Sequence, residues 1–455
     1  MKNSSRAKAG SSIGRFILKL FTVLLFVAVA GVTLFFAYGY RFDVEGQSVE
    51  KTSIIDLANR ASDVRVSVDA QLVSEFMPVQ LKGILPGLHT LNITKKGFRP
   101  WARTLTVNED IVTIVEDVLL VPEDVSSLIQ EAVQFGPEDV IYPGDGYLLA
   151  FSPGSQVLSI VELFNSGSFK EEEIGFYRAG LVAVETMPGQ RFLLHFDDGL
   201  SAYVSFSERV FKTFAPKTGA RKIRVDADRR LVYFLADGSL YRMGFDAAGE
   251  IPLEDYSLFE FRKDVADYEI DESGNVYYIT GGVLLGGAET GIPGWIARFP
   301  TILGAGDLTN LSIIQEGSHV ALVVRSDSDK RYLFFLDENR ELMLLAQKLK
   351  GSPFLTDHGD YLYADTDGNI FVYNGKKAET IPLTTIEGNF ELLGWFADRS
   401  HFLVLEEGKL VLHDIFDANV TELLSEYPAD RTFISGKILF FLKGGVLNSL
   451  SWIEE

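Results

Sequence analysis

The sequence predicts an all-β protein with one N-terminal transmembrane helix, in which a small β-sandwich precedes a seven- or eight-bladed β-propeller. Three observations indicate this fold class: a long apolar segment near the N-terminus, alternating strand patterns after it, and hairpins that recur with a period of about 41–47 residues. We expect a cytoplasmic tail at 1–15, the helix at 16–40, the sandwich at 41–123 and the propeller at 124–455.

The composition narrows the function classes. The chain has 455 residues, of which 47% are hydrophobic, enough for a sizeable core. It has 63 acidic and 42 basic residues, a net charge of −21, and such an acidic chain would repel phosphate backbones. We therefore expect no nucleic-acid partner. Because the sequence has no cysteine, disulfides, thiolate catalysis, zinc ribbons and iron–sulfur clusters are excluded.

The apolar segment from Phe16 to Tyr40 indicates a membrane anchor. The 21 residues from Leu20 to Tyr40 carry no charge. At about 1.5 Å per residue they form a helix of about 31 Å, close to the thickness of a hydrocarbon core. Five cations and no acid precede this stretch, which places the N-terminus in the cytoplasm and the bulk of the chain outside. The cations are Lys2, Arg6, Lys8, Arg15 and Lys19.

A cleaved signal peptide is the alternative interpretation, because Ala28-Val29-Ala30 resembles a cleavage site. Apolar sequence continues beyond it to Phe36, so cleavage would leave an apolar stub at the new N-terminus. The apolar region is also longer than the roughly 7–15 residues typical of a signal peptide. We therefore expect an uncleaved signal anchor.

Short antiparallel strands are expected after the anchor. The segment from Val64 to Asp69 alternates with period two, and Pro86-Gly87 supplies the residues of a tight turn. A second turn is expected from Lys95 to Phe98. The other segments of this sandwich are Pro78–Leu81, His89–Thr94, Thr104–Val107 and Val112–Leu120.

Four motifs of this region occur in the order seen in PEGA domains: Val68-Asp69, Pro78, Pro86-Gly87-Leu88-His89 and Lys95-Lys96-Gly97-Phe98. The part of the chain at about 60–121 therefore resembles the PEGA family. It departs from the family at Ala61-Ser62-Asp63-Val64, where the tetrapeptide that names the family would stand, and at Ala70, where glycine is usual. The resemblance implies a non-catalytic module of a bacterial envelope protein, beside a membrane span and in contact with protein or cell wall. A generic immunoglobulin-like spacer would have the same architecture.

Apolar strands joined by glycine turns recur through the rest of the chain, as in LVYFLADGSLYRMGF from Leu231. Their starts fall at Leu148, Val182, Leu231, Val276, Val320, Tyr361, Phe402 and Ile438. This spacing matches the four-stranded blade of a propeller, and two β-sandwiches in series are the alternative. The repeat loosely resembles the WD40-like and YWTD-like class, without the Gly-His and Trp-Asp signature. The segment from Ser126 to Val133 would form at most one or two helical turns.

No arrangement of side chains in the sequence predicts a catalytic, cofactor-binding or metal site. The histidines form no H-E-x-x-H or other close ligand pair, although His401 and His413 lie in one predicted hairpin. The segment from Ser152 to Ser155 lacks the G-x-S-x-G pattern of a hydrolase nucleophile. The six histidines are His89, His195, His319, His358, His401 and His413.

Two acidic segments resemble ligand-binding motifs, and the first of them is expected to be a hairpin turn. The segment from Asp365 to Asn369 resembles the start of a calcium loop, but Lys376 stands where the loop needs glutamate. The segment from Asp271 to Asn275 lacks the tryptophan and the spacing of a sialidase Asp box. We expect Asp327 and Asp329 at a loop tip.

The function expected from these features is binding rather than catalysis. We expect a single-pass protein of the bacterial cytoplasmic membrane whose extracytoplasmic propeller contacts protein or a cell-wall polymer, without a cofactor. A glycan-processing enzyme would instead need acids or arginines at the central pore. The loop from Ala288 to Gly294 would either line a binding face or simply connect strands. A glycan-binding protein would expose tryptophans for stacking, and the candidates are Trp101, Trp295, Trp395 and Trp452.

Overall fold

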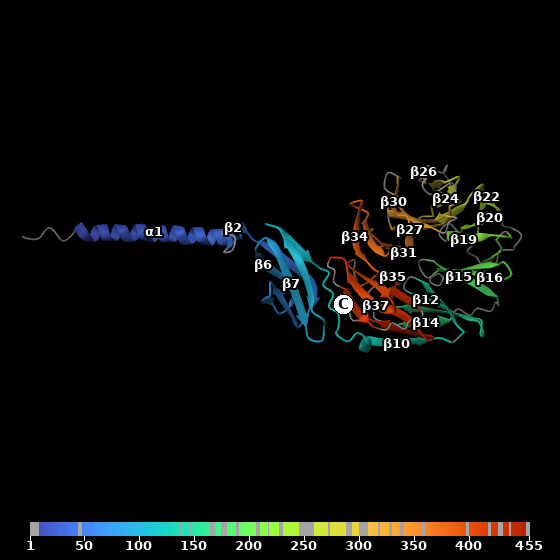
Figure 1. Ribbon diagram of the computed structural model, residues 1–455, viewed down its shortest axis with the longest axis horizontal. Helices are drawn as coiled ribbons and strands as arrows, with labels where there is room; N and C mark the ends of the chain where they lie inside the picture. The colour runs from blue at the N-terminus through green and yellow to red at the C-terminus, as the bar shows by residue number, and fades with distance from the viewer. Residues whose placement is uncertain are drawn as a thin grey trace, which may run out of the picture. The chain divides into compact units, whose positions relative to one another are not determined.

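A computed structural model gives the structure of the chain, which divides into two compact units, Met1–Asp124 (unit 1) and Val125–Glu455 (unit 2) (Figure 1). Each unit is described by itself. The structure describes residues 9–43, 48–136, 138–144, 147–163, 169–173, 180–187, 191–205, 210–216, 218–226, 231–244, 259–271, 274–287, 294–299, 308–316, 319–326, 330–336, 341–355, 360–396, 400–416, 420–425, 431–435 and 438–451.

Helix α1 (Ala9–Ala37) contains the expected apolar segment. Its part from Phe16 to Ala37 is long and apolar enough to cross a membrane, and none of it is buried inside the protein. The helix ends three residues before the expected boundary at residue 40. The reason is local: Gly39 adopts a left-handed backbone conformation with φ of 82°, and Tyr40 then begins a strand.

The rest of unit 1 consists of one hairpin and two sheets. The hairpin pairs β1 with β2, one sheet has the order β6-β3-β9, and the other has the order β5-β4-β7-β8. The strands are β1 (Tyr40–Asp43), β2 (Ser48–Lys51), β3 (Ser53–Ala61), β4 (Val64–Val68), β5 (Gln71–Ser74), β6 (Met77–Ile84), β7 (Gly87–Lys95), β8 (Trp101–Val107) and β9 (Val112–Val115). Side chains of both sheets, among them Ile55, Leu57, Val66 and Leu91, form one core.

The structure corrects the predicted sandwich at its last strand. β9 pairs with β3 in parallel, whereas only antiparallel strands were expected. β9 also ends at Val115 rather than at Leu120, because the chain leaves the ladder where Asp117 pairs with Arg103. That ion pair is buried, with 2.7 Å between Arg103 Nη1 and Asp117 Oδ1.

Unit 2 consists of four-stranded antiparallel sheets, and the described residues form eight of them. The first strands of the sheets are β11 (Val140–Gly144), β15 (Leu181–Met187), β19 (Arg221–Asp226), β23 (Asp267–Ile270), β27 (Thr309–Glu316), β31 (Leu349–Leu355), β35 (Phe390–Trp395) and β39 (Arg431–Ser435). The second strands are β12 (Tyr147–Ser152), β16 (Arg191–Phe196), β20 (Leu231–Ala236), β24 (Val276–Thr280), β28 (His319–Arg325), β32 (Asp360–Asp365), β36 (His401–Glu406) and β40 (Ile438–Lys443).

The outer half of each sheet follows directly in the chain. The third strands are β13 (Val157–Leu163), β17 (Ser201–Ser205), β21 (Ser239–Gly244), β25 (Val283–Gly287), β29 (Arg331–Leu336), β33 (Asn369–Asn374), β37 (Lys409–Asp414) and β41 (Val446–Leu450). The fourth strands are β14 (Phe169–Glu173), β18 (Val210–Phe214), β22 (Phe259–Arg262), β26 (Gly294–Arg298), β30 (Leu342–Ala346), β34 (Glu379–Thr385) and β38 (Val420–Leu424). The last sheet takes its fourth strand from the other end of the unit.

That fourth strand is β10 (Ile129–Gln134), which pairs antiparallel with β41. The beginning and the end of unit 2 therefore share one sheet, and the eight sheets return to their starting point. The segment expected to make one or two helical turns has only a short 3₁₀ helix, η1 (Ser126–Leu128), before this strand. Figure 1 labels β10 at the lower edge of unit 2, below the labels of β14 and β37.

Neighbouring sheets pack face to face through apolar side chains. One cluster joins Leu149 of β12 to Phe192 of β16, and the next joins Leu193 of β16 to Phe234 of β20. The middle strands are covered on both faces, so all five residues of β17 are buried. First strands of successive sheets, such as β31 and β35, lie beside one another, which makes the first strand the innermost of its blade. The architecture is a β-propeller with eight blades in the described residues.

One predicted repeat position was out of register. Val182 lies in β15, a first strand, whereas the other strand starts belong to second strands. The equivalent strand of that blade begins at Arg191. With this correction, the starts of successive second strands are separated by 37 residues (His401 to Ile438) to 45 residues (Leu231 to Val276). The two intervals on either side of Val182, to Leu148 and to Leu231, were therefore uneven because of one misassigned strand.

The pairing of β10 with β41 makes Leu447 a test of ring closure. This side chain is fully buried in the cluster that joins the first and last sheets. We expect Leu447→Ala to lower the free energy of unfolding by about 2–5 kcal/mol, because it leaves a cavity at the seam. Thermal or urea unfolding measures the loss. Val182→Ala, at an exposed position of β15, is the control, and equal effects of the two variants would contradict the closed ring.

Candidate functional site: a charged network across neighbouring blades

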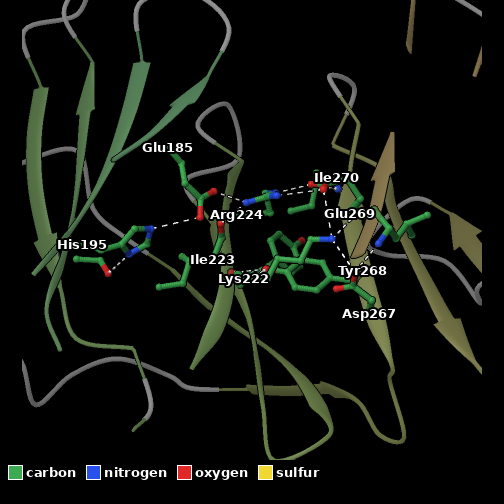
Figure 2. A network of polar contacts seen from close by, with 12 residues as sticks. Glu185, His195, Lys222, Ile223, Arg224, Asp267, Tyr268, Glu269 and Ile270 are labelled. Carbon is green, nitrogen blue, oxygen red and sulfur yellow. Dashed lines mark hydrogen bonds and ion pairs between the residues drawn. The ribbon is translucent and has the colours of Figure 1, made fainter. Parts of the chain in front are cut away.

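Charged side chains gather on the innermost strands of three consecutive blades (Figure 2). Residues two apart on a strand point to the same side, so β19 directs two cations and β23 directs two acids into one region. β15 and β16 add an acid and a histidine from the preceding blade. We call this group the inter-blade network, and its members are Glu185, His195, Lys222, Arg224, Asp267 and Glu269.

Arg224 is the centre of the network. Its Nε lies 2.5 Å from Glu269 Oε1 and its Nη2 lies 3.2 Å from Glu269 Oε2, so the guanidinium binds that carboxylate with two hydrogen bonds. Its Nη1 donates to Glu185 Oε2 on the other side. Planar, two-pronged pairing of this kind is the strong form of a charge-assisted hydrogen bond. One arginine therefore connects three blades.

Lys222 extends the network to a fourth blade. Its Nζ lies 2.9 Å from Asp267 Oδ2 and 3.5 Å from Glu269 Oε2, and it also donates to the main-chain carbonyl of Leu311 in β27. The main-chain N–H of Leu311 donates to the same Asp267 oxygen at 2.5 Å. The ammonium and the carboxylate thus fix the position of a neighbouring innermost strand.

Tyr268, between Asp267 and Glu269 on β23, contacts the main chain of the neighbouring blade. Its hydroxyl lies 2.5 Å from the carbonyl oxygen of Lys222 and 2.7 Å from that of Tyr233. Burial of the ring raises the pKa of Tyr268 well above its ordinary value of 10.0, and the nearby Arg224 only partly opposes this. The hydroxyl therefore stays protonated and serves as a hydrogen-bond donor between blades.

The network is most open to solvent at Glu185. Side-chain exposure is 7% for Asp267 and 30% for Arg224, but 39% for Glu185. Burial alone would raise the pKa of Glu185, but the hydrogen bond with His195 and the charge of Arg224 outweigh it, and the pKa lies below its ordinary value of 4.5. Glu185 is therefore a carboxylate, held in place and reachable from water.

A serine, a histidine and an acid meet at this open end. His195 Nε2 lies 3.4 Å from Glu185 Oε1, and His195 Nδ1 lies 3.1 Å from Ser201 Oγ. A hydrolase triad has the opposite arrangement, with the acid at Nδ1 and the serine at Nε2. Ser201 is also buried in β17. The geometry is that of a histidine hydrogen-bonded on both sides, not of an activated nucleophile.

The other described histidines each have a carboxylate partner outside the network. His413 Nε2 lies 2.7 Å from Glu406 Oε1, and its ring stacks on Phe402. His401 lies 3.7 Å from Asp414 on the adjacent strand, and His89 lies 2.6 Å from Asp69. His358 and the side chain of His319 lie outside the described residues. Among the described side chains, no three or more histidines, aspartates or glutamates are grouped so that they could hold a metal ion.

The segment from Asp365 to Asn369 forms a hairpin turn, as predicted, and Asp271 and Asn275 lie between the paired strands β23 and β24. Asp365 Oδ1 accepts the main-chain N–H of Asn369, and Oδ2 accepts its side-chain amide, both at 2.9 Å. Asp271 and Asn275 repeat this pair of contacts at 2.7 and 2.8 Å. Oxygens engaged in this way close the turn rather than a cation site. The predicted loop tip at Asp327 and Asp329, and residues 288–293 of the predicted binding loop, lie outside the described residues.

Four tryptophans were candidates for stacking on a sugar, and the structure describes the side chains of two of them, Trp101 and Trp395. Trp101 is buried and its ring lies under the guanidinium of Arg103, so it offers no face for stacking. Trp395 is half-buried, packs against Phe402 and donates from Nε1 to the carbonyl of Phe354 at 3.3 Å. The side chain of Trp295 and all of Trp452 lie outside the described residues.

The sequence prediction singled out one network member, His195, and only as an isolated histidine. A signal for the others does exist. Glu185 and Arg224 are 39 residues apart, and Arg224 and Glu269 are 45 apart, so each step is about one blade. An alignment of the first strands of the blades would have placed these charges at equivalent positions.

The fold and the network define this protein as a β-propeller with a charged cluster on its innermost strands. No protein-family model matches the chain, and no curated protein matches it in sequence. Its structure is similar to that of BamB from Moraxella catarrhalis, at 10% identity, with 71% of this chain and 100% of that chain covered and a TM-score of 0.47.

Two further solved structures are similar. Sqt1 from Saccharomyces cerevisiae matches at 10% identity over 71% of this chain and 99% of that chain, with a TM-score of 0.44. The C-terminal WD40 domain of Sif2 matches at 13% identity over 72% of this chain and 99% of that chain, with a TM-score of 0.44. Likeness at this level concerns the fold and says nothing of a ligand or a reaction.

The lowered pKa of Glu185 predicts how stability depends on pH. Its contribution is fully present above the ordinary pKa of 4.5 and is lost as the pH falls through the lower pKa of the folded state. We expect the difference in unfolding free energy between the native protein and Glu185→Gln to shrink as the pH is lowered from about 6 to about 3. Urea unfolding at a series of pH values measures it. Glu391→Gln, at an exposed position of β35, is the control, and a pH-independent difference for Glu185→Gln would contradict the assignment.

Proposed function

We propose that this protein is a membrane-anchored, extracytoplasmic binding protein of the bacterial cell envelope, which holds a protein or cell-wall partner at a propeller face. The observation that carries the anchor is the segment Phe16–Ala37 of α1, whose apolar side chains are exposed. Leaving such a length of apolar surface in water is unfavourable, and a bilayer core removes that cost. The cations before the segment favour a cytoplasmic N-terminus.

The binding role is supported by the geometry of the inter-blade network. Its inner members Lys222 and Asp267 are mostly buried and ion-paired with each other, whereas the carboxylate of Glu185 is partly open to water. A charge fixed in place loses little conformational freedom when a complementary cationic group docks on it. We therefore assign recognition to this side of the propeller and no catalytic role to the network.

A more specific element of the proposal concerns the sandwich of unit 1. Its resemblance to PEGA domains rests on four short motifs, in which Pro86 lies between β6 and β7 and Gly97 lies in the turn after β7. We propose that this module is a spacer in the envelope between the anchor and the propeller.

Removal of the anchor tests the localisation. We expect the full chain to sediment with bacterial membranes and to resist extraction by salt, whereas a chain without residues 1–39 is released into the soluble extracytoplasmic fraction when given a cleavable signal peptide. Protease added to intact spheroplasts would degrade the propeller of the anchored form. Degradation only after lysis would reverse the proposed orientation, and salt-extractable full-length protein would contradict the anchor.

Charge reversal at the open end of the network tests the binding role. We expect Glu185→Lys to reduce recovery of a cross-linked envelope partner by at least about tenfold, because a buried or half-buried like charge costs well over 1.4 kcal/mol. Glu422→Lys on the outer strand β38 is the matched control, since Glu422 is also half-exposed and ion-paired.

Equal recovery with the two variants would place the partner elsewhere. The rival assignment, a glycan-processing enzyme, depends on carboxylates and predicts turnover of an envelope glycan that Glu185→Gln abolishes. Such turnover would replace the binding proposal.

A further inference from the structure

Exposed apolar side chains gather at one end of the sandwich in unit 1. Leu88 is 73% exposed, Ile111 is 53% exposed and Val112 is 48% exposed. Leu88 follows the turn between β6 and β7, and Ile111 lies in the loop between β8 and β9. We call Leu88, Ile111 and Val112 the apolar tip. Exposed apolar groups gathered at the tip of a fold indicate a surface that is covered when the protein is in place.

The strand registers show that the apolar tip lies at the end where β3 begins. Ser53, the first residue of β3, pairs with Ile84 at the end of β6, and Ile54 pairs with Val112. Gly87 at the start of β7 pairs with Val107 at the end of β8. The two loops that carry the tip therefore meet at the start of β3.

The end of α1 is bonded to this same end of the sandwich. The carbonyl of Gly39, two residues beyond the helix, accepts the main-chain N–H of Thr52 at 2.8 Å and its hydroxyl at 2.7 Å. Thr52 immediately precedes β3. Lys51 Nζ lies 2.5 Å from Asp110 in the loop of the apolar tip. Only a few residues therefore separate the last turn of α1 from the tip.

We propose that the apolar tip inserts into the interface of the bilayer that α1 spans, so that the sandwich rests on the membrane. The inference depends on the proposed anchor. Bilayer interfaces accept apolar side chains presented beside charged groups, and membrane contact here covers surface that would otherwise stay in water. Of the acids at this end, Asp110 is ion-paired with Lys51, Asp69 lies 2.6 Å from His89 Nδ1, and Glu109 is exposed in the same loop as Asp110. The pairing of Asp110 with Lys51 reduces its repulsion from anionic lipid headgroups.

The opposite end of the sandwich provides a matched control. Phe76 is 61% exposed and apolar, and it precedes Met77, which pairs with Ala61 at the end of β3. It therefore lies at the far end of the same sheets. A label at Phe76 shares the module and the exposure of the tip but not its proximity to the anchor.

The experiment uses the full chain in vesicles of phosphatidylcholine and phosphatidylglycerol. Because the sequence has no cysteine, Leu88→Cys, Ile111→Cys and Phe76→Cys each provide one site for an environment-sensitive fluorophore. All three positions are exposed, so the substitutions leave the fold intact. We expect labels at residues 88 and 111 to emit at shorter wavelength and to be quenched by spin-labelled lipid at least about twofold more than the label at residue 76.

A label at Leu25→Cys in α1 separates failure of the anchor from failure of the tip. Quenching at residue 25 with no excess at residues 88 and 111 over residue 76 would overturn the tip contact and leave the anchor standing. No quenching at any of these positions would overturn both. Emission at shorter wavelength without lipid quenching would assign the tip to a contact with another copy of the chain instead of the bilayer, and would also overturn the proposal.

Discussion

The structure of unit 2 depends on one constraint: each of its sheets has two apolar faces and cannot cover either by itself. The five buried residues of β12, from Tyr147 to Phe151, and the five of β17 make this explicit. Packing against neighbours covers both faces only if the series of sheets has no end, so β10 must join β41. This closure also fixes the innermost strands, and thereby the meeting of Glu185, Arg224 and Glu269.

Much of this fold could be predicted from the sequence because the middle strands have a clear local sequence pattern. LVYFLA at Leu231 and HFLVLE at His401 are apolar runs followed by glycine turns. The first strands are different, since β19 reads RKIRVD and β23 reads DYEI. Each has only two apolar residues, and its polar residues pair across blades, so no continuous apolar run marks these strands. β10 was not predicted as a strand for a related reason: its partner, β41, lies at the far end of the chain.

The inter-blade network could not be predicted from local sequence, because its contacts join residues about one blade apart. It has three carboxylates and two permanent cations within contact distance, so its partners are satisfied only in the assembled ring. A desolvated ion pair contributes little net stability, but it strongly disfavours any arrangement that leaves one partner alone. Its role in the fold is therefore to set the relative register of blades. The open side of Glu185 is the part of the network to which we assign the proposed recognition.

The parallel pairing of β9 with β3 fits the spacer role that we propose for unit 1. Antiparallel hairpins alone would return the chain to the side from which it came, but β9 runs in the direction of β3 and ends away from the helix end. Contacts of the following segment agree, since Glu123 N–H donates to the carbonyl of Gly97 in the turn after β7. At about 3.3 Å per residue, the nine residues of β3 span about 30 Å. The chain therefore enters the sandwich at the end bonded to α1 and leaves it at the other end, which is the property that a spacer between a membrane and a binding domain requires.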